Sequence, residues 1–214
     1  MSKYLTEFIG TFFLVLTVYL AVKAAASPAL LAPLAIGSSL MVMIYMGGHI
    51  SGAHYNPAVS LAVLIRGKLA LVDFLVYVIV QMAGGVVASL AGKFLTDKPF
   101  APAPAGGTTL YQALVAEVLY TFALALVVLQ TATNDKVKGN SFYGLAIGFT
   151  VFAGAVAAGP LSGAAFNPAV GVGPNLVSQA WDKIAWETVA LYLSGPLAGG
   201  ALAGIVYRIQ ELGS

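Results

Sequence analysis

The chain has 214 residues, of which 59% are hydrophobic and only 8% are charged, and its formal net charge is +2. Soluble domains carry about 25% charged residues, so this composition excludes a soluble protein and indicates an integral membrane protein. The scattered Lys and Arg residues form no basic cluster of the kind that binds nucleic acid. Cys is absent from the sequence, which excludes disulfides and thiolate metal sites.

Six stretches are apolar and long enough to cross a bilayer as helices, which takes about 20 residues each. They lie near residues 4–24, 32–49, 71–93, 109–131, 142–159 and 186–208. Two shorter apolar stretches, 56–65 and 167–177, follow the second and fifth of these. As helices of about ten residues they would be about 15 Å long, roughly half of the hydrocarbon core. The sequence therefore predicts an all-α membrane protein with six transmembrane helices and two re-entrant half-helices.

Each predicted half-helix begins in the same short motif. The motif is Ser-Gly-Ala-His-Tyr-Asn-Pro-Ala-Val at 51–59 and Ser-Gly-Ala-Ala-Phe-Asn-Pro-Ala-Val at 162–170. Its Asn is a favoured helix N-cap, and its Pro suits the first helical position, where a missing N–H costs nothing. The residues before each Asn are expected to be non-helical and to expose carbonyl oxygens along a lumen: Gly52, Ala53, His54, Gly163 and Ala165.

The two halves of the chain repeat one another. Glu7 recurs as Glu117, Asn56 as Asn167, and the Gly pair at 84–85 as the pair at 199–200. Each half carries three full spans, an odd number, so the second half is inverted relative to the first. We expect one membrane channel domain over 1–214, built from inverted repeats at 1–95 and 109–214 that a loop rich in Pro and Gly connects. Inverted repeats with broken helices place the functional site near the bilayer midplane.

The two half-helices would point their N-termini at each other. Each N-terminus carries about half a positive charge from the helix dipole, so the positive field is highest where Asn56 and Asn167 meet. Each Asn also offers an NH₂ group as a donor. A neutral solute with an acceptor oxygen can bind there, whereas a cation meets a barrier. The sequence contains no nucleotide-binding loop, nucleophile elbow or metal-ligand cluster, so we expect no enzyme and no cofactor or metal.

On these residues the sequence resembles the aquaporins of the major intrinsic protein family, over nearly its whole length. The resemblance rests on the motif at 49–59, on the Asn-Pro-Ala sequence at 167–169 and on the repeated Glu7 and Glu117. It implies the aquaporin fold, a pore in each subunit, a homotetramer in the lipid bilayer, and Glu residues that accept hydrogen bonds from the re-entrant loops. It also implies two pore motifs, formed by Asn56, Pro57, Ala58, Asn167, Pro168 and Ala169.

The sequence departs from this family at one position. Members commonly carry Arg three residues after the second Asn, and this chain has Val170 there. An ungapped alignment around the motifs gives Ile36, Ala155 and Ala164 as the rest of the outer constriction, which is then apolar and wide. In this respect the second motif is similar to plant vacuolar-membrane aquaporins. The resemblance implies a passive channel for water and small neutral solutes (ammonia, urea, hydrogen peroxide or small polyols) that excludes ions and protons.

Other interpretations stay open at this point. Glu7 and Glu117 lie inside apolar spans, where carboxyls often relay protons, although their symmetric repetition favours a structural role. His54 could respond to pH, or it could be a wall residue with a fixed hydrogen bond. A secondary transporter can also have inverted repeats and broken helices, but it needs an ion-coupling charge beyond the Glu pair. A structural membrane protein is a third interpretation, which the short termini disfavour.

The basic residues predict the orientation of the chain. Six lie on one side of the six-span topology: Lys3, Arg66, Lys68, Lys136, Lys138 and Arg208. The positive-inside rule then places both termini in the cytoplasm. The short termini favour a bacterial plasma membrane over a vacuole. The Gly pairs at 84–85 and 199–200 are expected to mark close helix packing rather than hinges.

Overall fold

The computed structural model describes residues 1–23 and 31–212, and the described chain is helical. Within the described residues, six helices are long and apolar enough to cross a membrane. These are α1 (Ser2–Lys23), α2 (Leu31–Ser51), α4 (Leu71–Thr96), α5 (Leu110–Ala132), α6 (Tyr143–Ser162) and α8 (Trp186–Leu212). The two short helices are α3 (Pro57–Arg66) and α7 (Pro168–Ser178), and single turns η1 (Asp135–Val137) and η2 (Trp181–Lys183) complete the set. The expected fold class is thus confirmed, and residues 24–30 and 213–214 of the expected spans and repeats lie outside the described residues.

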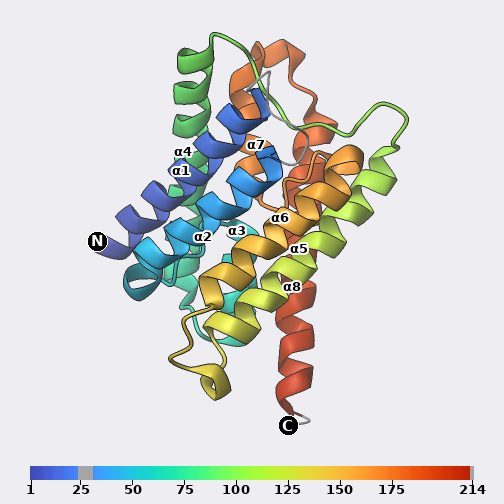
Figure 1. Cartoon of the computed structure of the whole chain (residues 1–214). Helices are drawn as coiled ribbons and strands as arrows, with labels where there is room; N and C mark the ends of the chain where they lie inside the picture. Colours follow the sequence, from blue (N-terminus) through green and yellow to red (C-terminus); the bar gives the residue numbers. More distant parts are fainter. Residues whose placement is uncertain (24–30, 213–214) are drawn as a thin grey trace.

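The packing of the first half is repeated in the second. Helix α1 packs against α2 and α4, and α5 packs in the same way against α6 and α8. The half-helices cross over: α3 packs mainly on α8, and α7 packs mainly on α4 (Figure 1). Contact between α2 and α6 joins the two halves at a second place. Each half-helix is therefore held against the last long helix of the opposite half.

Glycines permit this crossed packing. A Cβ atom on Gly85 of α4 would lie 2.7 Å from the carbonyl oxygen of Ala169 in α7, and one on Gly200 of α8 would lie 2.2 Å from that of Ala58 in α3. Real Cβ atoms do not approach a carbonyl so closely, and small residues are what allow helix backbones to touch in membranes. The Gly pairs mark close packing, as expected from the sequence.

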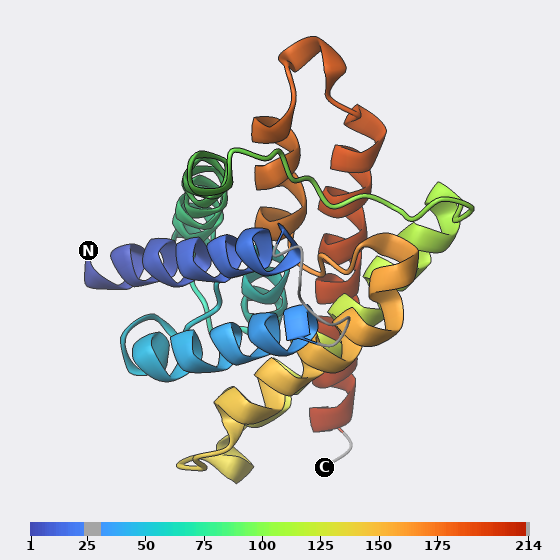
Figure 2. The ribbon, with the colours of Figure 1, turned by 45° about the horizontal axis from the view of Figure 1, so that its top comes forward.

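The segment between α4 and α5 crosses one end of the bundle (Figure 2). We call residues 98–105 the strap. The hydroxyl of Tyr19 donates to the carbonyl of Lys98 at 2.7 Å, and the N–H of Ala105 donates to the carbonyl of Leu161 at 3.0 Å. The sequence predicted a connecting loop here, and the structure adds that both ends of the strap are bonded to the long helices.

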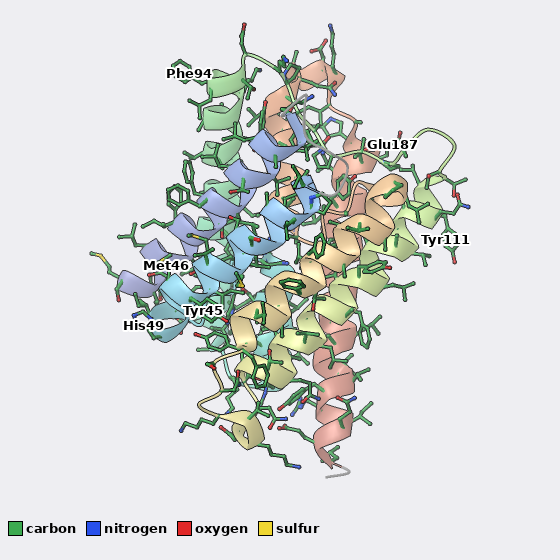
Figure 3. All side chains as sticks on the ribbon, viewed as in Figure 1. Tyr45, Met46, His49, Phe94, Tyr111 and Glu187 are labelled. Atoms are coloured by element: carbon green, nitrogen blue, oxygen red, sulfur yellow. The ribbon has the colours of Figure 1, made fainter. Side chains whose placement is uncertain are left out.

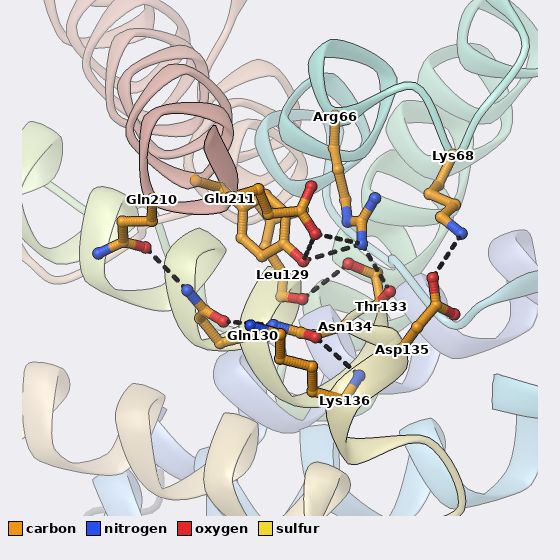
Figure 4. A network of polar contacts seen from close by, with 11 residues as sticks. Arg66, Lys68, Leu129, Gln130, Thr133, Asn134, Asp135, Lys136, Gln210 and Glu211 are labelled. Carbon is orange, nitrogen blue, oxygen red and sulfur yellow. Dashed lines mark hydrogen bonds and ion pairs between the residues drawn. The ribbon is translucent and has the colours of Figure 1, made fainter. Parts of the chain in front are cut away.

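The opposite end of the bundle is held by a polar network (Figure 4). Arg66, at the end of α3, donates from Nη2 to the carbonyl of Thr133 at 2.9 Å and to the hydroxyl of Tyr207 at 2.8 Å. Lys68 and Asp135 form an ion pair at 3.3 Å. These contacts join α3, the α5–α6 connection and α8, so Arg66 and Lys68 lie at the same end as that connection, in agreement with the six-span topology.

The outer surface of the bundle is apolar (Figure 3). Phe94 on α4 is 87% exposed and Tyr111 on α5 is 74% exposed, and both point away from the bundle. Apolar side chains exposed along whole helices suit contact with lipid tails rather than with water. The chain is therefore an integral, multi-pass membrane protein.

Candidate functional site: a pore between the half-helices

Asn56 and Asn167 cap the two half-helices with the same geometry. Both have φ of −157° and ψ of 119°, and their side-chain oxygens accept from the N–H of Ala58 at 2.8 Å and of Ala169 at 2.9 Å. Pro57 and Pro168 stand at the first helical position, as the motif predicts. Both Asn residues are almost fully buried. Two helix N-termini are thereby brought together inside the bundle.

Each Asn also bonds to the other half of the chain. Nδ2 of Asn56 donates to the carbonyl of Phe166 at 2.9 Å, and Nδ2 of Asn167 donates to the carbonyl of Tyr55 at 2.8 Å. From the sequence, both N–H groups of each Asn side chain are expected to be available as donors to a solute. The structure uses one of them to join the halves, which leaves one per Asn for a molecule in the pore.

The residues before each Asn adopt an unusual backbone that is repeated in both halves. Gly52 and Gly163 have φ of 87° and 83°, and the non-glycine residues that follow also have positive φ: Ala53 (51°), Tyr55 (50°), Ala164 (51°) and Phe166 (50°). Non-glycine residues rarely occupy this left-handed region, and they persist there only when the surroundings hold them. Buried polar contacts must therefore fix these loops.

Two buried carboxylates supply those contacts. Glu7 of α1 accepts from the N–H of His54 at 2.9 Å and of Tyr55 at 2.6 Å, and from the hydroxyl of Ser51 at 2.7 Å. Glu117 of α5 repeats the pattern with three donors: Ala165 N–H (3.0 Å), Phe166 N–H (2.7 Å) and the Ser162 hydroxyl (2.7 Å). Both carboxylates have no exposed surface. Their geometry fits a structural role in holding the re-entrant loops.

The first loop has polar neighbours that the second lacks. Nε2 of Gln81 donates to Glu7 at 2.9 Å and to the hydroxyl of Ser60 at 3.0 Å, and Ser60 lies 3.0 Å from Nδ1 of His54. Sequence analysis singled out neither Gln81 nor Ser60. The sequence contained one signal for them, namely a polar residue inside each of two apolar helices. Burying such a residue is costly unless it forms a hydrogen bond.

An outer cavity of about 400 Å³ lies on one side of the paired Asn residues. Its wall contains all four residues of the expected constriction, namely Ile36, Ala155, Ala164 and Val170. Asn56, Asn167, Ala53, Gly163 and Ala165 also line it, together with Phe100 and Pro102 of the strap. The four constriction residues, both Asn residues and all the predicted carbonyl-bearing residues except Gly52 therefore meet at one cavity, whose wall is mainly apolar. The other residues of the two motifs line neither of the two cavities: Pro57, Ala58, Pro168 and Ala169.

A second cavity of about 550 Å³ opens at the other end of the bundle. Gly52, His49 and Lys68 line it, with residues of the α5–α6 connection. His54 and Val128 line both cavities, so they lie where the two meet. The two cavities are arranged as the two mouths of a pore. Within residues 1–23 and 31–212, no group of three or more His, Cys, Asp or Glu could hold a metal ion.

Comparisons with known proteins agree with this architecture. The sequence model of the family "Major intrinsic protein" matches residues 1–207. "Probable aquaporin TIP2-2" of Arabidopsis thaliana is 37% identical over 228 residues, covering 100% of this chain and 89% of that protein. A "Probable aquaporin TIP-type" of Medicago truncatula is 38% identical over 223 residues, covering 98% of this chain and 87% of the relative.

A solved structure also superposes on the chain. The X-ray structure of the aquaglyceroporin from Plasmodium falciparum gives a TM-score of 0.83 at 21% identity and covers 96% of this chain and 94% of that one. At this identity the likeness shows the fold, while the sequence relatives show the family. The resemblance drawn from the two Asn-Pro-Ala motifs is confirmed, and this chain belongs to the major intrinsic protein family, the aquaporins.

Proposed function

We propose that this chain is a passive channel that conducts water and, in addition, small neutral solutes such as ammonia, urea, hydrogen peroxide or small polyols. The observation that carries the proposal is the outer cavity, which Ile36, Ala155, Ala164 and Val170 line without a charged side chain among them. A constriction of small apolar residues neither narrows the pore to one water nor repels a neutral solute. The cavity ends at the paired Asn amides, which supply donors for an acceptor oxygen.

Ions and protons are excluded in this proposal by the half-helix N-termini. The dipoles of α3 and α7 place about half a positive charge each at Asn56 and Asn167, and half-helix dipoles serve this purpose generally in aquaporin-type channels. A cation at this point loses hydration without gaining an anionic ligand. Glu7 and Glu117 are fully engaged by the loops they hold, which disfavours ion coupling and with it a secondary transporter.

The proposal also gives each of the pore residues a role. Ile36, Ala155, Ala164 and Val170 form the selectivity constriction, and Glu7 and Glu117 anchor the loops. Gly52, Ala53, His54, Gly163 and Ala165 present carbonyl acceptors to the solute along the non-helical runs. The half-helices and these runs together guide a solute past the Asn pair in single file.

The assembly and orientation belong to the same proposal. A homotetramer with a pore in each subunit and both termini in the cytoplasm suits the family and the distribution of basic residues. The expected bacterial plasma membrane receives no support from the relatives, which are plant proteins. We retain the coarser statement that the chain is an integral, multi-pass membrane channel.

Proteoliposomes test the proposed function. Water flow is measured by stopped-flow light scattering with an impermeant osmolyte, and urea uptake is measured in the same vesicles, for the native chain, Val170→Arg and Val170→Met. We expect fast water flow in all three. Val170→Arg adds charge and bulk and should lower urea permeability about tenfold or more, which corresponds to a barrier about 1.4 kcal/mol higher. Val170→Met adds bulk alone and should lower urea permeability less.

Three outcomes contradict the proposal. Water flow no faster than in empty liposomes would exclude a conducting channel. Fast water flow without urea or ammonia uptake in the native chain would mean that a narrower filter than the four apolar residues controls the pore. Saturation of uptake at low solute concentration would instead favour the transporter.

A further inference from the structure

The strap contributes to the wall of the outer cavity beside the four constriction residues. Phe100, Ala101, Pro102 and Ala103 line this cavity together with Ile36, Ala155, Ala164 and Val170. The Phe100 side chain is 9% exposed and packs on the ring of Tyr19 with the centroids 5.3 Å apart. The segment that connects the two halves of the chain therefore also borders the path of a solute.

The middle of the strap is held from inside the bundle by α7. Asn175 is 4% exposed, and its Nδ2 donates to the carbonyl of Pro102 at 3.1 Å and to the carbonyl of Gly171 at 2.8 Å. Ser178, one turn further along α7, donates from its hydroxyl to the carbonyl of Phe100. The bond to Gly171 braces the Asn175 amide against its own helix, so the amide offers a fixed donor to the strap.

Asn175 is well placed to fix the position of the strap at the cavity. One end of the strap is held by the bond from Tyr19 to Lys98, and the other end by the bond from Ala105 to Leu161. Asn175 instead bonds to Pro102, which is itself part of the cavity wall. A buried carbonyl needs a donor, and moving the strap outward would break this one. Because α7 begins at the Asn167 motif, the strap is positioned relative to the same helix that carries Val170.

The opposite mouth uses a related device. Arg66, at the C-terminal end of α3, donates to the carbonyl of Thr133 in the α5–α6 connection, which borders the inner cavity. In each half, a side chain in the C-terminal part of the half-helix thus holds a backbone carbonyl of the segment at that mouth. The two half-helices use different residues at non-corresponding positions for this purpose, which indicates that fixing these segments is part of how the pore is built.

We propose that Asn175 is the positioning residue that holds the strap, a wall of the outer cavity, at the width which selects solutes by size. The inference rests on the proposed passive channel and deepens it. None of the four constriction residues is aromatic, so Phe100 supplies the bulkiest side chain beside them, together with Pro102. Without the amide of Asn175, Pro102 loses its donor and the strap can move outward.

The first experiment compares permeabilities to solutes of different size. Full-length native chain, Asn175→Ala, Phe100→Ala and Gln130→Ala are reconstituted, and water, urea and glycerol permeabilities are measured. One net hydrogen bond changes an equilibrium by about fivefold, so we expect the glycerol-to-water ratio to rise by about that factor in Asn175→Ala. Phe100→Ala should raise the same ratio. Gln130→Ala removes an amide that bonds Gln210 at 2.8 Å and Asn134 at 2.9 Å. Gln130 lines neither cavity and lies at the end opposite the outer constriction, so this variant should leave the ratio unchanged.

The second experiment does not depend on the stability of Asn175→Ala. The chain contains no Cys, so a single thiol can be introduced at either of two positions. Ala103 is exposed and lines the outer cavity, whereas Gly106 does not line it, and a Cβ added at Gly106 would meet no atom beyond its chain neighbours within 4 Å. A bulky methanethiosulfonate reagent should stop flow through Ala103→Cys. It should label Gly106→Cys to the same extent, as measured by mass spectrometry, without stopping flow.

The results separate the two proposals. Absence of water flow in the native chain would contradict the proposed channel itself. Fast water flow combined with unchanged solute ratios in Asn175→Ala and Phe100→Ala, or with full flow through labelled Ala103→Cys, would overturn the role of the strap and leave the channel intact.

Discussion

The two re-entrant loops share one backbone but differ in the side chains around it. Both have positive φ at the same positions, a carboxylate that accepts from two backbone N–H groups, and an Asn that caps its half-helix and bonds across to the other half. Around the first loop lie His54, Ser60 and Gln81, whereas the corresponding positions of the second repeat carry Ala165, Gly171 and Pro196.

This difference shows which contacts the architecture requires and which it merely permits. The carboxylate, the Asn cap and the crossed amide occur twice, so they belong to the construction of any such loop. The His–Ser–Gln cluster occurs once, next to the junction of the two cavities that His54 lines. It makes the first half of the pore wall more polar than the second, in which the apolar Ala164 and Val170 predominate.

The largest loss of stability is expected from substitutions that break the backbone contact between a long helix of one half and the half-helix of the other. Gly200→Ala places a Cβ 2.2 Å from the carbonyl oxygen of Ala58, and Gly85→Ala places one 2.7 Å from that of Ala169. The obstacle is backbone in both cases, so the cost should exceed the about 1–3 kcal/mol of ordinary overpacking. We expect loss of monodisperse protein in detergent and of water flow, more severely for Gly200→Ala.

A matched control is Gly159→Ala in α6. A Cβ there meets no atom within 4 Å beyond its chain neighbours and its own helix backbone. The following Pro160 offsets the higher helix propensity of Ala, so the thermal midpoint should change little. If Gly200→Ala were as stable as Gly159→Ala, the crossed contact of α8 with α3 would not be essential to the fold.

Substitution of the two carboxylates should show whether the loops are equally dependent on them. Glu7→Gln and Glu117→Gln each replace an acceptor oxygen with an NH₂ group that faces a donor, and the expected loss is about 2–3 kcal/mol of stability. Glu7 accepts from four groups, including Gln81, and Glu117 from three, so Glu7→Gln should be the more damaging. The thermal midpoint of the protein in detergent and its water permeability in proteoliposomes measure this difference.

Comparison with Glu187→Gln provides the baseline, because Glu187 lies exposed in the first turn of α8. An equal or larger loss in Glu117→Gln than in Glu7→Gln would contradict the ranking of the two loops.

Much of this fold could be predicted because its signals are local or repeated. Hydropathy predicts the six spans, and an Asn-Pro pair inside an apolar sequence predicts where a helix begins, since capping depends on neighbouring residues alone. The repetition of Glu7 as Glu117 revealed the symmetry before any contact was known. Helices α4 and α8 extend several residues beyond the predicted ends, because helix length beyond the apolar core leaves little trace in composition.

Contacts between distant positions could not be predicted in the same way. The crossed bond from Asn56 to Phe166 and the bond from Asn175 to Pro102 join positions whose proximity depends on the complete packing. Gln81 and Ser60 were missed for the same reason, since each alone is one polar residue in an apolar helix. The connecting loop, rich in Pro and Gly, has the composition of any loop, and only the structure shows that its strap borders the pore.

The smallest effect should come from the cluster that occurs in one loop only. Gln81→Leu removes two bonds, to Glu7 and to Ser60, but it also removes Oε1, a buried acceptor that has no partner in the described part of the chain. The two changes oppose each other, so we expect a loss of about 1 kcal/mol of stability.

Ser60→Ala should cost a similar amount of stability, because it removes the contacts of Ser60 with His54 and Gln81. Because Gln81 and Ser60 are in direct contact, the double variant should lose less than the sum of the two single losses. Strictly additive losses in thermal midpoint would mean that the cluster does not act as one unit, and the first loop would then depend on the same contacts as the second.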